Sequence, residues 1–283
     1  ALNSTGQNSK KRTYVFQDKT YSYDVLQPTD KVKGILMLFP GKGEKGSTKF
    51  DKTKLPGILQ TQGYLTIIPE LEYALFVNQA LQKQVKEIIS VENAKLKTSN
   101  LALGGFSAGG SVALSLAEHF FSLDSSWNLK SVFVIDPPID LQRIYVSSLQ
   151  LLNYKCSNLI HREGSETKRY LDRTLGSPTD SLQNYILFSP FLASQPDGGN
   201  ARLLNRVPIR LYTEPDLNFV KNRFCQELTM ENLNVTDLEK LNKVLLKVGN
   251  KKCEYIVTRG RGYHTWNIIE PNELAGWILS YTK

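Results

Sequence analysis

Short hydrophobic segments alternate with amphipathic ones along most of the chain. Near the start, residues 13–17 and 20–26 alternate apolar and polar side chains with the period of two that is typical of antiparallel strands. Later segments are continuously apolar, as expected of strands buried on both faces of a parallel sheet: 34–39, 64–68, 100–106 and 131–135. Because helical patterns separate these segments, we expect right-handed β-α-β units.

The clearest helical pattern covers residues 79–92, where Leu81, Val85, Ile88 and Ile89 fall on one face. Strand-like segments return at 208–212 and 254–258, and 274–279 reads as a closing helix.

Between the strands at 131–135 and 208–212 the strand pattern stops, and helical patterns appear near 140–154 and 165–174. We therefore expect a cap segment of about 140–205 inserted into the sheet. Residues 1–12 are polar and resemble a disordered tail, which leaves 13–283 as a single domain with this insertion.

The composition excludes several classes of protein. Of the 283 residues, 41% are hydrophobic and 22% are charged, which is typical of a globular chain. The formal net charge of +8 would suit a polyanion, but the basic residues are scattered and lack interleaved aromatics, so we expect no nucleic-acid partner. The uncharged stretch 98–117 is rich in Gly and Ser, and we expect no membrane span. The oligomeric state stays open.

The first residues form a polar run without an initiator Met. This is compatible with the processed N-terminus of an exported protein and equally with a trimmed N-terminus. The three cysteines, Cys156, Cys225 and Cys253, have no CxxC spacing. We therefore expect neither a metal site nor a disulfide framework, and favour three idle thiols over a single Cys225–Cys253 bond.

The main candidate for chemistry is Ser107, in the pentapeptide Gly-Phe-Ser-Ala-Gly. The apolar strand 101–106 precedes it and the helical run 111–121 follows it, as a nucleophile elbow requires. In such a sharp turn, side chains two residues before and after the serine would collide, so Gly105 and Gly109 have a structural purpose. The alternative is a glycine-rich helix start with an idle serine.

A serine hydroxyl needs a neighbouring base, and the chain has three histidines. His119 is about three turns along the same predicted helix as the nucleophile, which is too far, and His161 falls among polar residues of the predicted cap. His264 follows the last strand in a Gly-containing loop, at the sheet edge where the serine emerges. We therefore choose His264 as the base.

The third residue should be a carboxylate that orients the imidazole. Asp216 lies just beyond the strand 208–212, and it gives the expected chain order of serine, acid and histidine. Glu214 could replace it, and Asp136, directly after another strand, is the second alternative. We choose Asp216.

Two backbone N–H groups should hold the oxyanion that forms during acyl transfer. We expect them to be those of Ala108 and Lys42, with Gly41 or Gly43 as alternatives to Lys42. The segment from Gly41 to Gly46 also matches GxGxxG, and with Glu70 at the end of the next strand a dinucleotide-dependent oxidoreductase is a rival interpretation. It leaves the elbow and its histidine without a role.

These motifs resemble the α/β-hydrolase superfamily over nearly the whole chain, most closely its esterase and dienelactone-hydrolase-like members. The resemblance implies an α/β fold with a mostly parallel, eight-stranded sheet, helices on both faces and a catalytic triad at the carboxyl edge of the strands. It implies no cofactor and no metal. A small-molecule ester is the expected substrate, and a thioesterase, a peptidase and a catalytically silent binding protein remain alternatives.

Overall fold

The computed structural model describes residues 9–16, 18–44, 52–96, 98, 100–123 and 127–282. Within them one sheet runs through the molecule, with the strand order β1-β2-β4-β3-β5-β6-β7-β8. The strands are β1 Lys10–Phe16, β2 Lys19–Leu26, β3 Gly34–Phe39, β4 Tyr64–Pro69, β5 Asn100–Phe106, β6 Asn128–Ile135, β7 Ile209–Thr213 and β8 Cys253–Val257. The β1–β2 and β2–β4 pairs are antiparallel and the others are parallel, so the predicted mostly parallel, eight-stranded sheet is confirmed.

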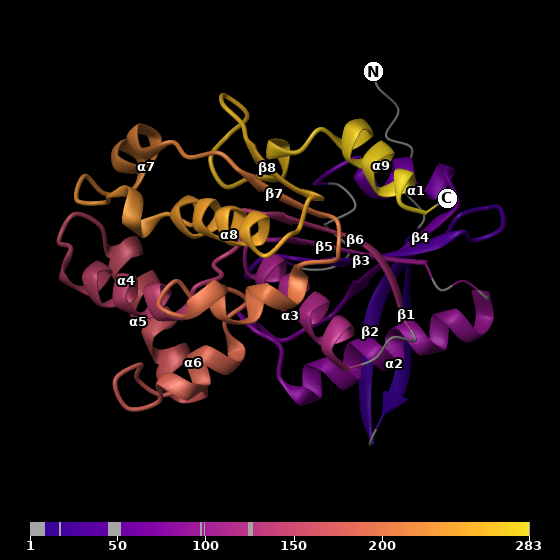
Figure 1. Ribbon diagram of the computed structural model, residues 1–283, viewed down its shortest axis with the longest axis horizontal. Coiled ribbons are helices and arrows are strands. Elements are labelled where there is room, and N and C mark those ends of the chain that lie inside the picture. The colour runs from indigo at the N-terminus through magenta and orange to yellow at the C-terminus, as the bar shows by residue number, and fades with distance from the viewer. Residues whose placement is uncertain are drawn as a thin grey trace.

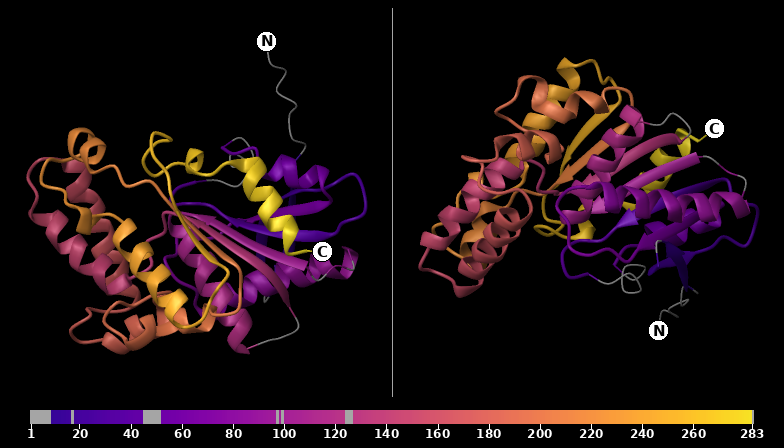
Figure 2. Two further views of the ribbon diagram at one scale, coloured as in Figure 1. Left: turned by 45° about the horizontal axis from the view of Figure 1, so that its top comes forward. Right: turned by 90° about the horizontal axis from the view of Figure 1, so that it is seen from below.

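Helices cover both faces of this sheet (Figures 1 and 2). They are α1 Leu55–Thr61, α2 Gln79–Leu96, α3 Ala108–Leu123, α8 Val235–Lys247 and α9 Pro271–Ser280. Along β3, Ile35, Met37 and Phe39 belong to the core that includes side chains of α2, α3 and α8. Leu36 and Leu38 belong to a second core, together with α1 and α9. Side chains alternate between the faces of a strand, so the uninterrupted apolar run of β3 is the consequence of two buried faces.

The segment between β6 and β7 contains α4 Leu141–Asn153, α5 Asn158–Thr174, α6 Leu182–Phe188 and the 3₁₀ segment η2 Pro196–Leu204. In Figure 1, α4, α5 and α6 lie together at one end of the molecule, away from α1 and α9. We keep the name cap segment for residues 140–205. A further excursion follows β7 and consists of α7 Leu217–Arg223 and η3 Met230–Asn232.

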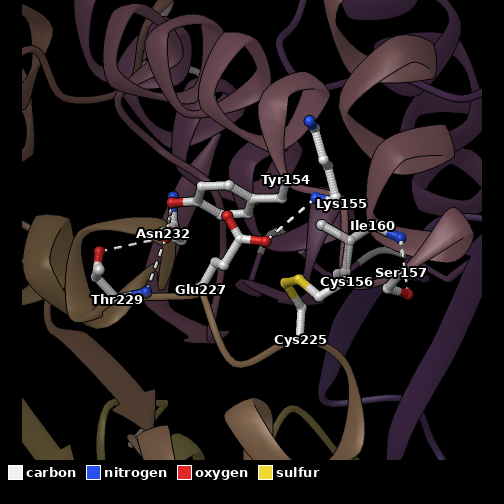
Figure 3. The surroundings of a disulfide bond; sticks show 9 residues. All are labelled: Tyr154, Lys155, Cys156, Ser157, Ile160, Cys225, Glu227, Thr229 and Asn232. Carbon is white, nitrogen blue, oxygen red and sulfur yellow. Dashed lines mark hydrogen bonds between the residues drawn. A yellow bond between two sulfur atoms is a disulfide. The ribbon is translucent and has the colours of Figure 1, made fainter.

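Two expectations from the sequence need correction. The tail was expected to extend to residue 12, but β1 begins at Lys10 and pairs with β2, because an edge strand tolerates exposed polar side chains such as those of residues 10 and 11; residues 1–8 lie outside the described part. The cysteines are not all idle: Cys156 and Cys225 form a disulfide, and Cys253 is the free thiol (Figure 3).

The disulfide joins the connection between α4 and α5 to the chain just after α7. The two cysteines are 69 residues apart in the sequence, so only the fold brings them together. It therefore links the cap segment to the excursion after β7. Among the described helices, none combines the length and apolar character needed to cross a membrane.

Candidate active site

Ser107 occupies the sharp turn between β5 and α3. Its backbone has a φ of 52°, in the left-handed region that costs a residue with a side chain about 1–3 kcal/mol. The amide of Ser107 donates to the carbonyl of Ile135 at 2.9 Å, and its carbonyl accepts from the amide of Gly110 at 2.8 Å. The strained turn is thus fixed on both sides, and α3 starts directly after the serine, at Ala108.

The glycines around the turn are required by the close approach of the backbone. A Cβ atom at Gly105 would lie 2.2 Å from the carbonyl oxygen of Gly109. A Cβ at Gly109 would lie 2.2 Å from the carbonyl oxygen of Phe39, at the end of β3. Both obstacles are main-chain atoms, so a side chain at either position would have to move a strand or the helix.

His264 lies in the loop between β8 and η4 (Trp266–Ile268), and its φ of 50° is also left-handed. Its Nδ1 lies 2.5 Å from Oδ2 of Asp136, and its ring packs on that of Phe106, with centroids 4.7 Å apart. Burial on its own would lower the pKa of His264, but the hydrogen bond and negative charge of Asp136 outweigh burial and raise the pKa above its ordinary value.

The carboxylate beside the imidazole is therefore Asp136, which corrects the choice of Asp216. Asp216 is the N-cap of α7, and its Oδ1 accepts from the amide of Phe219 at 2.8 Å. Aspartate is common at the N-cap of a helix, where its carboxylate accepts hydrogen bonds from the backbone of the first turn. The carboxylate of Asp216 is engaged in this way within its own segment. Asp136 directly follows β6, the strand hydrogen-bonded to the elbow strand β5.

Asp136 is buried, with 3% of its surface exposed, and every polar part of it has a partner. Its amide donates to the carbonyl of Tyr212 at 2.8 Å, and its Oδ1 accepts from the hydroxyl of Thr213 at 2.9 Å. Its carbonyl accepts from the side-chain amide of Asn234 at 3.0 Å. These bonds hold a backbone with a φ of 48° and leave Oδ2 for His264.

Glu214, the other alternative acid, anchors the loop that carries His264. Its carboxylate accepts from the Thr258 hydroxyl at 2.8 Å and from the amides of Arg261 and Gly262 at 2.9 and 2.8 Å. Burial alone would raise the pKa of Glu214, but these donors, first that of Gly262, lower it below its ordinary value. Sequence reasoning missed this loop-anchoring role, although Glu214 directly follows β7.

The loop after β3 runs beside the elbow. A Cβ at Gly41 would lie 3.3 Å from Cβ of Ser107, and the amide of Gly41 donates to the carboxylate of Glu44 at 2.8 Å. The Gly41 N–H is therefore already engaged. Lys42 follows it, and its ammonium bonds Glu166 of α5 at 2.7 Å and lies 5.3 Å from the ring centroid of Tyr73.

A cavity of about 490 Å³ opens over the elbow, a size typical of small-molecule sites. Ser107, Ala108, His264 and Lys42 all line it. Its remaining walls come from the cap segment, the excursion after β7 and neighbouring loops, and they are mostly apolar: Leu75, Phe106, Ile144, Leu151, Leu159, Ile160, Val220, Phe224, Leu228, Leu233 and Tyr263. Glu44 and Glu163 add carboxylates to this wall.

The other histidines lie elsewhere. His119 is on α3, where burial lowers its pKa below the ordinary value, and His161 is exposed on α5; neither lines this cavity. For the rival dinucleotide motif, Gly41 and Gly43 belong to the loop at the elbow, and Gly46 lies outside the described residues.

No family model and no curated protein matches this sequence. Solved structures do match its fold. Carboxyl esterase 2 of Tuber melanosporum is 14% identical with a TM-score of 0.62, covering 99% of this chain and 88% of its own. An S-formylglutathione hydrolase of Agrobacterium tumefaciens is 10% identical with a TM-score of 0.60, covering 97% and 95%.

A third match is a fluorophosphonate-binding serine hydrolase of Staphylococcus aureus, 11% identical, with a TM-score of 0.60 and coverage of 97% of this chain and 98% of its own. At such low identities the likeness concerns the fold. Together with the strand order and the elbow between β5 and α3, it shows that this chain has the α/β-hydrolase fold.

Proposed function

We propose that this protein is a serine hydrolase that cleaves carboxylic esters through an acyl-enzyme on Ser107. One observation carries the proposal: the elbow serine Ser107 lines the same cavity as His264, whose imidazole is hydrogen-bonded to the buried Asp136. A nucleophile, a base and a carboxylate that orients the base are the three groups that acyl transfer by serine requires.

In the proposed reaction, His264 takes the proton of the Ser107 hydroxyl as Oγ attacks the ester carbonyl. Asp136 holds the imidazole by Nδ1 and stabilises its protonated form. The protonated His264 then donates to the leaving alcohol, and the acyl group stays on Oγ. Water, deprotonated by the same imidazole, attacks the acyl-enzyme. The protonated His264 then gives its proton to Oγ as the C–Oγ bond breaks, which releases the acid and restores free Ser107.

We propose the amides of Ala108 and Lys42 as the oxyanion donors. Ala108 directly follows the nucleophile at the start of α3, where the helix dipole favours negative charge. The engaged amide of Gly41 favours Lys42 as the second donor. Each donor would stabilise the transition state by about 3 kcal/mol.

The apolar walls of the cavity favour an ester with an apolar acyl group. Most of the apolar side chains over Ser107 come from α4, α5, α7 and the segment around η3. Burying a methylene against them is worth about 0.8 kcal/mol, so catalytic efficiency should rise with acyl length until the cavity is filled. Thioesters and aminoacyl amides are the competing substrates.

A panel of p-nitrophenyl esters from acetate to decanoate, with matched thioesters and aminoacyl anilides, tests this proposal. The expected result is ester turnover that depends on chain length and is lost in Ser107→Ala and His264→Ala. Folded wild-type protein that turns over none of these substrates favours a binding protein on the same fold. Thermal stabilisation by NAD would instead support the dinucleotide alternative.

A further inference from the structure

Asn234 lies on the cavity wall and bonds the backbone of Asp136, not its carboxylate. Its Nδ2 donates to the Asp136 carbonyl at 3.0 Å. Asp136 has a left-handed backbone that persists only while its surroundings hold it. Its amide is held by Tyr212 of β7, so the bond from Asn234 fixes the opposite side of the residue.

The orientation of the Asn234 amide is set by Arg143. The Arg143 Nη2 donates to Oδ1 of Asn234 at 3.3 Å. A guanidinium can only donate and an amide oxygen can only accept, so this bond turns Nδ2 of Asn234 toward Asp136. The side chain of Arg143 thus determines that the amide nitrogen of Asn234, and not its oxygen, faces the carbonyl of Asp136.

Arg143 is itself fixed by two further partners. Its Nε donates to Oδ2 of Asp237 in α8 at 2.6 Å, and its Nη1 donates to the carbonyl of Glu231 in η3 at 3.0 Å. The Asp237 side chain is fully buried and that of Arg143 is 16% exposed, so water competes little for this pair. Arg143 stands on α4, the first helix of the cap segment.

We propose that Arg143 and Asn234 are positioning residues, which tie the first cap helix to the backbone of Asp136 and thereby hold the Asp136 carboxylate against His264. This inference rests on the proposed function. A displacement of α4 would be passed through Arg143 and Asn234 to Asp136, so the helix that lines the substrate cavity also aligns the base. A misplacement of about 1 Å in such a group costs on the order of 10²-fold in rate.

The test compares Asn234→Ala and Arg143→Lys with a matched control, Asn200→Ala. Asn200 is also half-buried and donates from Nδ2 to main-chain carbonyls, those of Ile186, Leu187 and Ser189, but it does not line the cavity. For each variant, the rate of Ser107 labelling by a fluorophosphonate is measured against pH. The pKa of the His264 ring is followed by NMR, and thermal unfolding reports stability.

We expect Asn234→Ala to label about 10²-fold more slowly than wild type. The pKa of His264 should fall in this variant, because a misplaced Asp136 stabilises the imidazolium less. Arg143→Lys keeps the charge beside Asp237 and should be intermediate, and it serves as the second variant if Asn234→Ala fails to fold. Asn200→Ala should lower the stability of the protein and leave the labelling rate and the pKa of His264 unchanged.

Wild-type labelling rate and wild-type His264 pKa in both test variants would overturn the inference and leave the proposed function intact. Absence of labelling in folded wild-type protein would overturn the proposed function instead. In that case the His264 pKa still decides whether Arg143 and Asn234 position the pair: a lower pKa in the variants supports the inference, and an unchanged one refutes it.

Discussion

Nδ1 of His264 lies 2.5 Å from Oδ2 of Asp136, although 128 residues separate them in the chain. Both residues, like Ser107, have a left-handed backbone, with φ values of 50°, 48° and 52°. Strain of this kind concentrates where function requires a fixed geometry. The same three residues are those proposed to carry the reaction.

The carboxylate of Asp136 is expected to be essential, and that of Asp216 is not. Asp136→Asn should lower kcat/KM by about 10⁴-fold, because an amide cannot stabilise the imidazolium and favours the wrong tautomer of His264. Asp216→Asn is the control: asparagine also caps a helix, so α7 and the activity should change little. Both variants are measured by ester hydrolysis at a pH on the plateau of the activity profile. A large loss of activity in Asp216→Asn but not in Asp136→Asn would mean that Asp216, and not Asp136, acts with His264.

The pH dependence of wild-type activity should report the same pair. His264 must be neutral to act as base, and Asp136 raises its pKa, so kcat/KM should rise with pH through a pKa above the ordinary histidine value. In Asp136→Asn the residual activity should rise at lower pH than in wild type. If the rise of activity with pH occurs at the same pH in Asp136→Asn as in wild type, Asp136 does not raise the pKa of His264.

Gly109→Ala should unfold or strongly destabilise the protein. Its new Cβ would meet the main-chain oxygen of Phe39 at 2.2 Å, and overpacking of this kind costs about 3 kcal/mol or more. At Gly276, inside α9, an added Cβ would have no atom within 4 Å apart from the neighbouring residues and backbone of its own helix. Gly276→Ala should therefore stabilise the protein by about 0.5–1 kcal/mol, and urea denaturation measures both changes.

Glu214→Gln should loosen the loop that carries His264. The carboxylate accepts hydrogen bonds from Thr258, Arg261 and Gly262, and bonds to a charged acceptor are worth about 1.5–3 kcal/mol each. We expect a loss of about 2 kcal/mol in stability at neutral pH and a lower kcat.

The pH dependence separates this effect from a general packing loss. Because the donors lower the pKa of Glu214 in the folded state, its contribution is complete above the ordinary glutamate pKa. It is lost as pH falls through the lowered folded pKa. The stability difference between wild type and Glu214→Gln should therefore shrink in acid, and a constant difference would mean that the charge is unimportant.

Removal of the Cys156–Cys225 disulfide should cost about 4 kcal/mol, as the chain-entropy model gives for a loop of this length. The bond also joins two walls of the cavity, since α5 begins just after Cys156 and α7 ends just before Cys225. Cys156→Ser with Cys225→Ser, compared with Cys253→Ser, should lower stability and weaken the preference for long acyl chains. Denaturation with and without reductant checks the first effect, and the ester panel checks the second.

Much of the fold could be predicted because local patterns determine it. The uninterrupted apolar runs of β3 to β6 require two covered faces, and the helical pattern of α2 appears in the spacing of Val85, Ile88 and Ile89. The glycines around Ser107 reveal a close backbone crossing even without coordinates. These signals lie within a few residues of the feature that they predict.

The identity of the carboxylate beside His264 and the disulfide pairing depend on contacts between distant segments. Asp216 and Asp136 both follow a strand, and only the loop carrying His264 decides which carboxylate the imidazole reaches. The short helix α7, which Asp216 caps, spans seven residues and was not among the helices predicted from the sequence. Cys156 and Cys225 are paired by the packing of the cap segment beside the excursion after β7, which residue spacing does not encode.

The most direct test of the proposed function is the site of covalent labelling by a fluorophosphonate, determined by mass spectrometry of the digested protein. A single adduct on the peptide that contains Ser107, absent from Ser107→Ala and formed much more slowly in Asp136→Asn than in Asp216→Asn, is the expected result. A folded wild-type protein that stays unlabelled, or carries its adduct on another residue, would contradict it.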